Sequence, residues 1–185
     1  MLREIEGDLL DCAGASADGS FANADTYIVQ QCCCVSTYTA GLSQAIAKKW
    51  PALNPYKSRK AIPGTRRATL ETRAEPGTAA ILRFANGISA ANLVCLYGQY
   101  GPGKPGVYHD DEIEPYDDSA KARLGFFKWA LEDMNSTIED GATLYFPHGI
   151  GCGLAGGDWD AYKSALIVFA RTHPSYSVVV VRLKK

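Results

Sequence analysis

The sequence predicts one α/β domain of three layers, in which helices cover both faces of a mixed sheet of about six strands. Apolar, β-branched runs of strand length alternate along the chain with segments whose apolar residues recur at helical spacing. The dipeptide Asn86-Gly87 separates two of the strand-like runs and favours an antiparallel pair, which makes the sheet mixed. A chain of 185 residues buries one core and leaves no room for a second domain, so we expect residues 1–185 to form a single domain.

Composition excludes several classes of protein. The formal net charge is -1 and charged residues make up 21% of the chain, so no overall field attracts nucleic acid or an anionic membrane. No apolar run approaches the roughly 20 residues of a membrane helix, and the first residues lack a secretory pattern. Of the six cysteines, three are contiguous and the others lie in or beside apolar segments, which favours buried reduced thiols over disulfides or a metal site. We therefore expect a soluble, intracellular protein without a metal.

The first strands are indicated by alternation and by residue type. Residues 1–6 alternate weakly and predict a short strand that ends at the turn Gly7-Asp8. Residues 12–24 are mostly Gly, Ala, Ser, Asn and Asp, and we expect a helical turn followed by a loop. Residues 26–34 are β-branched, aromatic and small apolar in type, which predicts an interior strand.

A small-residue loop at residues 36–41 follows that strand. Leu42, Ile46 and Trp50 then recur at helical spacing, and Pro51 ends the helix. A strand that runs through a glycine loop into a helix exposes backbone N–H groups and the positive end of the helix dipole. This transition is therefore suited to an anion.

Residues 54–77 carry six basic side chains among prolines and glycines, without a sustained period. We interpret them as a solvated surface excursion; the alternative is a basic patch that contacts RNA. These basic residues are Lys57, Arg59, Lys60, Arg66, Arg67 and Arg73.

Residues 78–84 and 90–97 are predicted to be the antiparallel strands, and the segment after them resembles a Walker A loop. Gly98 to Lys104 has the spacing G-x-x-x-x-G-K, but Pro105 stands where that motif needs Ser or Thr and no helical pattern follows. We expect a flexible loop beside a ligand cleft, and we expect residues 109–111 to face solvent.

Asp118 or Ser119 is predicted to cap the longest helix, whose apolar face follows from helical spacing. That face consists of Ala120, Leu124, Phe127, Leu131 and Met134. Residues 142–146 form a strand and residues 177–183 form a last buried strand. Between them, a helix begins near Trp159 and ends at His173-Pro174.

The stretch Tyr145–Trp159 repeats the transition from strand through glycines to helix. If it lies beside the loop at 36–41 on neighbouring parallel strands, both helix N-termini surround one pyrophosphate. With both loops in place, the chain resembles the macro domain family of ADP-ribose binders. The match is carried by Pro147-His-Gly-Ile-Gly-Cys-Gly-Leu-Ala-Gly-Gly-Asp-Trp159, supported by Gly7-Asp8-Leu9 and the strand at 28–34.

The resemblance implies a set of ligand-binding residues. Asp8 would accept a hydrogen bond from the adenine amino group and Leu9 would read adenine through its backbone; the alternative for Asp8 is an Asx-turn. Gly41 and Leu42 of the first loop and residues of the second loop would hold the diphosphate and distal ribose. The second-loop residues are Gly151, Cys152, Gly153, Leu154, Ala155 and Gly156.

The chain also departs from the family at positions linked to catalysis. Cys33 replaces an asparagine that positions the distal ribose in many relatives, and Ala155 stands where some hydrolases of protein-linked ADP-ribose have a catalytic aspartate. Asp158 and Cys33 are the candidate catalytic residues; for Asp158 the alternative is a helix cap.

The resemblance implies a monomer without a cofactor that binds ADP-ribose or a derivative, on its own or attached to protein or nucleic acid. It further implies hydrolysis of ADP-ribose-1″-phosphate or of an ADP-ribosyl adduct. The alternative function is a non-catalytic reader of ADP-ribose.

Overall fold

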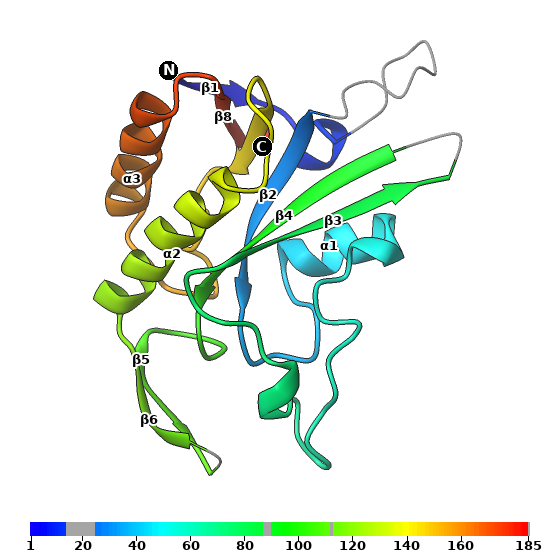
Figure 1. Cartoon of the computed structure of the whole chain (residues 1–185), viewed down its shortest axis with the longest axis vertical. Coiled ribbons are helices and arrows are strands. Elements are labelled where there is room, and N and C mark those ends of the chain that lie inside the picture. The colour runs from blue at the N-terminus through cyan, green and yellow to red at the C-terminus, as the bar shows by residue number, and fades with distance from the viewer. Residues whose placement is uncertain (14–24, 87–89, 112, 185) are drawn as a thin grey trace.

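A computed structural model describes residues 1–13, 25–86, 90–111 and 113–184 and contains the predicted mixed sheet (Figure 1). The six strands run in the order β1-β8-β7-β2-β4-β3. All neighbours pair in parallel except β3 and β4, which are antiparallel as Asn86-Gly87 predicted. Residues 87–89 of that turn and residues 14–24 lie outside the described residues. The strands are β1 (Leu2–Glu6), β2 (Thr26–Cys33), β3 (Ala79–Ala85), β4 (Ala90–Gln99), β7 (Thr143–Pro147) and β8 (Ser177–Arg182).

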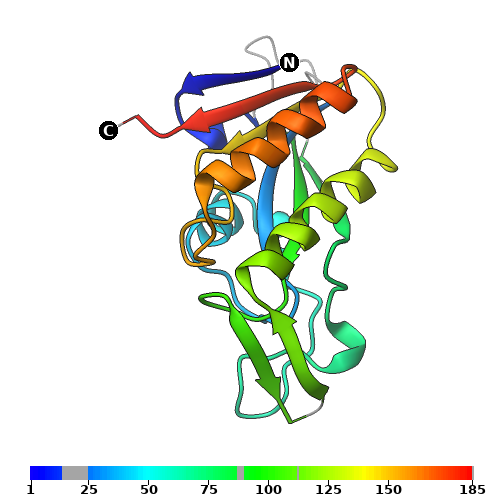
Figure 2. The same ribbon diagram turned by 90° about the vertical axis from the view of Figure 1, so that its left-hand side faces the viewer.

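The helices cover both faces of the sheet, which confirms the three-layer prediction. Helix α1 (Leu42–Lys49) lies on one face, and α2 (Ala120–Asn135) and α3 (Trp159–Thr172) lie side by side on the other (Figures 1 and 2). Three single-turn helices are η1 (Leu9–Asp11), η2 (Pro51–Leu53) and η3 (Leu70–Thr72). In the described part of the chain, no helix has the length and apolar character needed to cross a bilayer.

Each strand contributes to two cores because successive side chains point to opposite faces. In β8, Val178 and Val180 pack under α2 and α3, whereas Val179 and Val181 pack on the α1 side. All six cysteines are free thiols, as predicted; four are buried, and Cys12 and Cys152 are half-buried.

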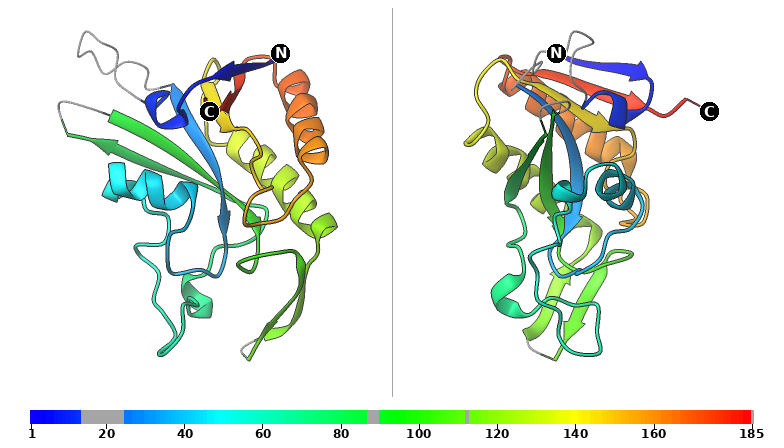
Figure 3. Two further views of the ribbon diagram at one scale, coloured as in Figure 1. Left: turned by 180° about the vertical axis from the view of Figure 1, so that it is seen from behind. Right: turned by 90° about the vertical axis from the view of Figure 1, so that its right-hand side faces the viewer.

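A second, two-stranded sheet stands beyond the main one, where the sequence predicted only a loop. Strands β5 (Gly106–Asp110) and β6 (Ile113–Asp118) form a hairpin that lies beside the excursion of residues 54–77 (Figure 3). Tyr116 of the hairpin stacks on Tyr100 with ring centroids 4.2 Å apart. Packing between segments distant in sequence holds this hairpin, so local patterns did not indicate it.

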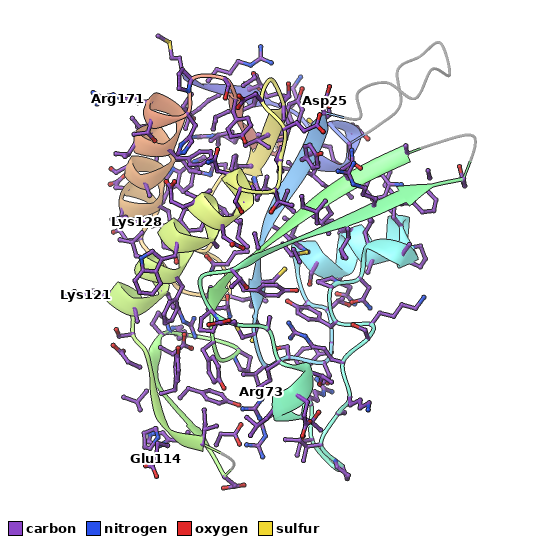
Figure 4. All side chains as sticks on the ribbon, viewed as in Figure 1. Asp25, Arg73, Glu114, Lys121, Lys128 and Arg171 are labelled. Atoms are coloured by element: carbon purple, nitrogen blue, oxygen red, sulfur yellow. The ribbon has the colours of Figure 1, made fainter. Side chains whose placement is uncertain are left out.

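The excursion is therefore not simply solvated. The Asp110 carboxylate is buried and pairs with Arg73 at 2.8 Å and with Arg67 at 3.3 Å. The Arg73 side chain is only 4% exposed. Lys121 and Lys128, by contrast, are exposed basic side chains that point away from the sheet on the outer face of α2 (Figure 4). The expectation that Asp110 faces solvent was wrong, because it is the counter-ion of two arginines.

Ser119 caps α2, and Asp118 has a different role. The Ser119 hydroxyl accepts a hydrogen bond from the Ala122 N–H at 3.2 Å. Asp118 is 2% exposed and forms a two-pronged ion pair with the equally buried Arg123, with Nε and Oδ1 3.0 Å apart. The Asp118 carboxylate also accepts the N–H groups of Tyr100 and Gly101. This pair joins the end of β4 to α2.

Breaking the pair should be costly. Arg123→Met removes the guanidinium and leaves the Asp118 carboxylate buried without a counter-ion. We expect the free energy of unfolding to fall by about 3–5 kcal/mol, measured by urea denaturation. Lys121→Met, an exposed change on the same helix, is the control and should stay within about 0.5 kcal/mol of the parent. An equal effect of both changes would contradict the structural role of the pair.

Candidate functional site

A cavity of about 380 Å³ lies at the carboxyl ends of the parallel strands. Its walls include the loop from β2 to α1 and the loop from β7 to α3, and β2 and β7 are neighbours in the sheet. Ligands of open α/β sheets bind at this edge, because loops from adjacent strands converge there. The two glycine loops singled out in the sequence thus face one space.

The first loop presents unpaired amides at the start of α1. Gly41 is the N-cap residue with a φ of 57° and offers no side-chain cap. The Ser43 hydroxyl donates to the Ala40 carbonyl and accepts a hydrogen bond from the Ala40 N–H. Within the described residues, the N–H groups of Gly41, Leu42 and Ser43 donate to no acceptor. These donors lie at the positive end of the helix dipole.

The second loop presents a similar row of donors. The N–H groups of Gly153, Leu154 and Ala155 also have no acceptor in the described part of the chain. Leu154 is 69% exposed, and its Cδ1 lies 3.7 Å from the point where a Cβ on Gly41 would stand. The two loops therefore approach each other across the cavity.

Arg123 holds the second loop in place. Its Nη1 donates to the carbonyl of Ala155 at 2.9 Å and to the carbonyl of Gly103 at 2.6 Å. Gly103 and Pro102 line the cavity, so the Walker-like segment does lie beside the cleft, as predicted. The buried ion pair of the fold thus positions a wall of the site.

The floor is polar but carries no charge. Gln31 donates through Nε2 to the Gln99 amide oxygen at 3.2 Å, and Gln99 donates to the Gly101 carbonyl at 3.0 Å. Gln30 is 2% exposed, and its amide oxygen has no partner among the described residues. Each of these glutamines stands near the carboxyl end of an otherwise apolar strand. A polar residue at that position is the signal by which the sequence could have identified them as part of the site.

Cys33 lines the cavity as a neutral thiol. Its Sγ donates to the Tyr100 carbonyl at 3.1 Å and its N–H donates to the Tyr56 hydroxyl at 3.2 Å. Burial raises the pKa of the Cys33 thiol above its usual value. A protonated thiol is a weak nucleophile, so these contacts favour a positioning role over covalent chemistry.

His148 is the imidazole at the cavity, and the sequence reading assigned it no role. Its Nε2 lies 3.0 Å from Nη2 of Arg182. A guanidinium only donates, so Nε2 is the acceptor in this contact. The ring also packs on Trp159, with centroids 4.6 Å apart.

The structure brings most of the predicted ligand-binding residues together at the cavity. Those that line it are Cys33, Gly41, Leu42, Gly151, Gly153, Leu154 and Ala155. Leu9, Cys152 and Gly156 do not line it; Leu9 is buried in the core on the α1 side. Among the described residues, no group of three or more His, Cys, Asp or Glu side chains is arranged to hold a metal ion.

The two predicted carboxylates stand outside the cavity lining. Asp8 caps η1 by accepting the Leu10 N–H at 2.8 Å, which is the Asx-turn alternative. Asp8 lies at the same edge of the sheet as His148. The N–H of the preceding Gly7 donates to the carbonyl of Arg182 in β8, and the His148 N–H donates to the carbonyl of the adjacent Val181. Asp158 caps α3 by accepting the Ala161 N–H at 2.9 Å.

Several solved structures share this fold, and three of them match over the whole chain. A protein of unknown function from Bacteroides thetaiotaomicron is 20% identical with a TM-score of 0.58, and the match covers 100% of this chain and 98% of that one. A second structure from that organism is 19% identical with a TM-score of 0.58 and full coverage of both chains. The macrodomain of Mycobacterium tuberculosis DarG is 16% identical with a TM-score of 0.55, covering 100% and 98%. No protein-family model and no curated protein matches the sequence.

Two glycines of the second loop provide a matched test of its packing. Gly149 and Gly151 both have a φ of 74°, but only at Gly151 would a Cβ collide, 2.4 Å from Cε1 of Tyr162. Gly149→Ala should cost about 1–2 kcal/mol in the free energy of unfolding, because of its backbone conformation alone. Gly151→Ala should cost about 1–3 kcal/mol more, because of overpacking. Urea denaturation measures both, and equal losses would contradict the close approach of Tyr162.

Proposed function

We propose that this chain, whose fold is that of a macro domain, binds ADP-ribose in the cavity between its two glycine loops. One observation carries the proposal: backbone N–H groups of both loops, unpaired within the described residues, line one space whose described lining contains no carboxylate. A diphosphate needs several donors at once and is repelled by carboxylates. The arrangement therefore suits a diphosphate held between two sugars.

Backbone amides are well suited to this task. Their positions are set by the fold, and α1 adds the positive end of its dipole beside Gly41. Gly41, with its positive φ of 57°, lets the backbone of the first loop turn at the start of α1 in a conformation that a side chain would strain. We assign diphosphate contacts to Gly41 and Leu42 of the first loop and to the second-loop residues that line the cavity, Gly151, Gly153, Leu154 and Ala155.

The ligand has a direction in this proposal. Asp8 and Leu9 lie towards the His148 end of the sheet edge, and we assign the adenine to that end. The distal ribose then extends towards Cys33, Ser36 and Tyr56, which also line the cavity. Cys33 donates its thiol proton to a carbonyl and would contact the ribose mainly by shape.

Hydrolysis of ADP-ribose-1″-phosphate or of an ADP-ribosyl adduct on protein or nucleic acid is the candidate activity. It needs a group that activates water. Asp158 is the candidate general base and Cys33 the candidate at the distal ribose, but Asp158 serves α3 as its cap and Cys33 is a neutral thiol. These two contacts favour the alternative, a reader that binds ADP-ribose without turning it over.

Calorimetry with ADP-ribose tests binding, and ADP alone tests the contribution of the distal ribose. We expect saturable binding of ADP-ribose and weaker binding of ADP. Chromatography after incubation with ADP-ribose-1″-phosphate and with a mono-ADP-ribosylated protein tests activity. Release of phosphate or of ADP-ribose would identify an enzyme, and no turnover alongside tight binding would identify a reader. Absence of ADP-ribose binding would refute the proposed function.

The adenine contact has its own test. Asp8→Ala removes the carboxylate that we assign to the adenine amino group and should weaken ADP-ribose binding by about 1.5–3 kcal/mol. Asp11→Ala, which removes another exposed carboxylate from the same short helix, is the matched control and should leave the affinity unchanged. Calorimetry on both variants gives the comparison, and an unchanged affinity in Asp8→Ala would locate the adenine elsewhere.

A further inference from the structure

The cations around the cavity differ in what their side chains contact. Arg123 is held by an ion pair, and Arg59 is held by two backbone carbonyls that lie 2.9 and 2.7 Å from its Nη1. The guanidinium of Arg66 lies over the ring of Tyr38, 5.0 Å from the centroid. Lys104, by contrast, is exposed and forms no ion pair with any carboxylate in the described ranges. The fold therefore leaves the charge of Lys104 without a structural role.

The backbone of Lys104 is fixed beside the second glycine loop. Its carbonyl accepts a hydrogen bond from Nη2 of Arg123 at 3.4 Å, and the Ala155 carbonyl accepts one from Nη1 of the same guanidinium at 2.9 Å. The carbonyl of Gly103, which lines the cavity, accepts a third at 2.6 Å. One buried side chain thus holds the Walker-like segment and the second loop against each other.

The side chain of Lys104 starts out along the surface of that loop. Its Cγ lies 3.6 Å from the point where a Cβ on Gly156 would stand, so the absence of a side chain at Gly156 leaves room for the lysine stem. The neighbouring N–H groups of Leu154 and Ala155 have no acceptor in the described part of the chain. Because the stem is long and flexible, the ammonium can reach an anion bound at those amides.

Neutral donors leave much of the charge of a diphosphate uncompensated. The amides of both loops and the dipole of α1 supply partial charges only. The described lining of the cavity contains neither a lysine nor an arginine. A lysine ammonium is a compact full charge that commonly binds phosphate. A lysine at the rim of the second loop therefore supplies what the lining lacks.

We propose that Lys104 extends over the second glycine loop and contacts the diphosphate of the ligand through its ammonium. The inference rests on the proposed function, which puts the diphosphate at the amides of that loop. It also explains the spacing from Gly98 to Lys104: the segment keeps the phosphate-binding lysine of a Walker A loop, whereas Pro105 replaces the Ser or Thr that would hold magnesium.

Calorimetry with ADP-ribose at two ionic strengths tests the contact. Lys104→Met should weaken binding about tenfold at about 0.05 M ionic strength, as the loss of one close charge interaction allows. At about 0.5 M the difference should shrink to less than about twofold, because salt screens a contact made at an exposed rim. A loss of affinity caused by a distorted loop would not depend on salt in this way.

Matched variants control for charge and for folding. Lys104→Arg keeps the positive charge and should keep most of the affinity. Lys128→Met removes an exposed charge from the outer face of α2 (Figure 4) and should bind ADP-ribose like the parent at both ionic strengths. The midpoint of urea denaturation should be the same in Lys104→Met and in the parent, because the side chain is exposed.

Inorganic pyrophosphate separates the inference from the proposed function. This probe carries the diphosphate without adenosine or ribose, and at low ionic strength it should bind the parent more tightly than Lys104→Met. If ADP-ribose does not bind the parent, the proposed function fails, and the pyrophosphate comparison alone decides on Lys104: equal binding, or none, overturns the contact. If ADP-ribose binds the parent, equal affinity in Lys104→Met, or a loss of the same size at both ionic strengths, overturns the contact and leaves the proposed function intact.

Discussion

The buried pair of Asp118 and Arg123 connects the fold to the site. Taking both charges out of water is unfavourable, and the pair persists because nearly every polar atom in it is satisfied: Asp118 accepts two backbone N–H groups, and Arg123 donates to the carbonyls of Gly101, Gly103, Lys104 and Ala155. Such a pair contributes geometry more than net stability. It connects the end of β4, the start of α2 and both the Walker-like segment and the second glycine loop, and it thereby sets one wall of the cavity.

Sheet order supplies the other constraint. Because β2 and β7 are parallel neighbours, the loops that follow them emerge at the same edge and face each other. The site that results is built from backbone donors and neutral side chains, with arginines behind and above one end of it. Charge is thus placed near the ligand space without lining it, which leaves the amides to determine the geometry of anion contact.

Local patterns predicted most of the sheet and helices, because residues such as Val178 to Val181 and the apolar face of α2 carry their periodicity in the sequence. They failed at the hairpin of β5 and β6 and at Asp110. The hairpin is held by Tyr100 against Tyr116, and Asp110 is held by arginines from the excursion. Neither contact has a periodic signal, because each depends on segments brought together only by the fold.

The sequence by itself determined that strands run through two glycine loops into helices, since glycine spacing and helix starts are local properties. It also identified Gly41 and the second loop as the anion-binding candidates. Only the tertiary structure decided which side chains stand behind those loops. It placed Arg59 against the carbonyls of Cys33 and Ser36, and it placed Arg123 against the carbonyls of Gly103 and Ala155. Long side chains reach partners far away in sequence, and the burial that makes those partnerships consequential exists only once the chain has folded.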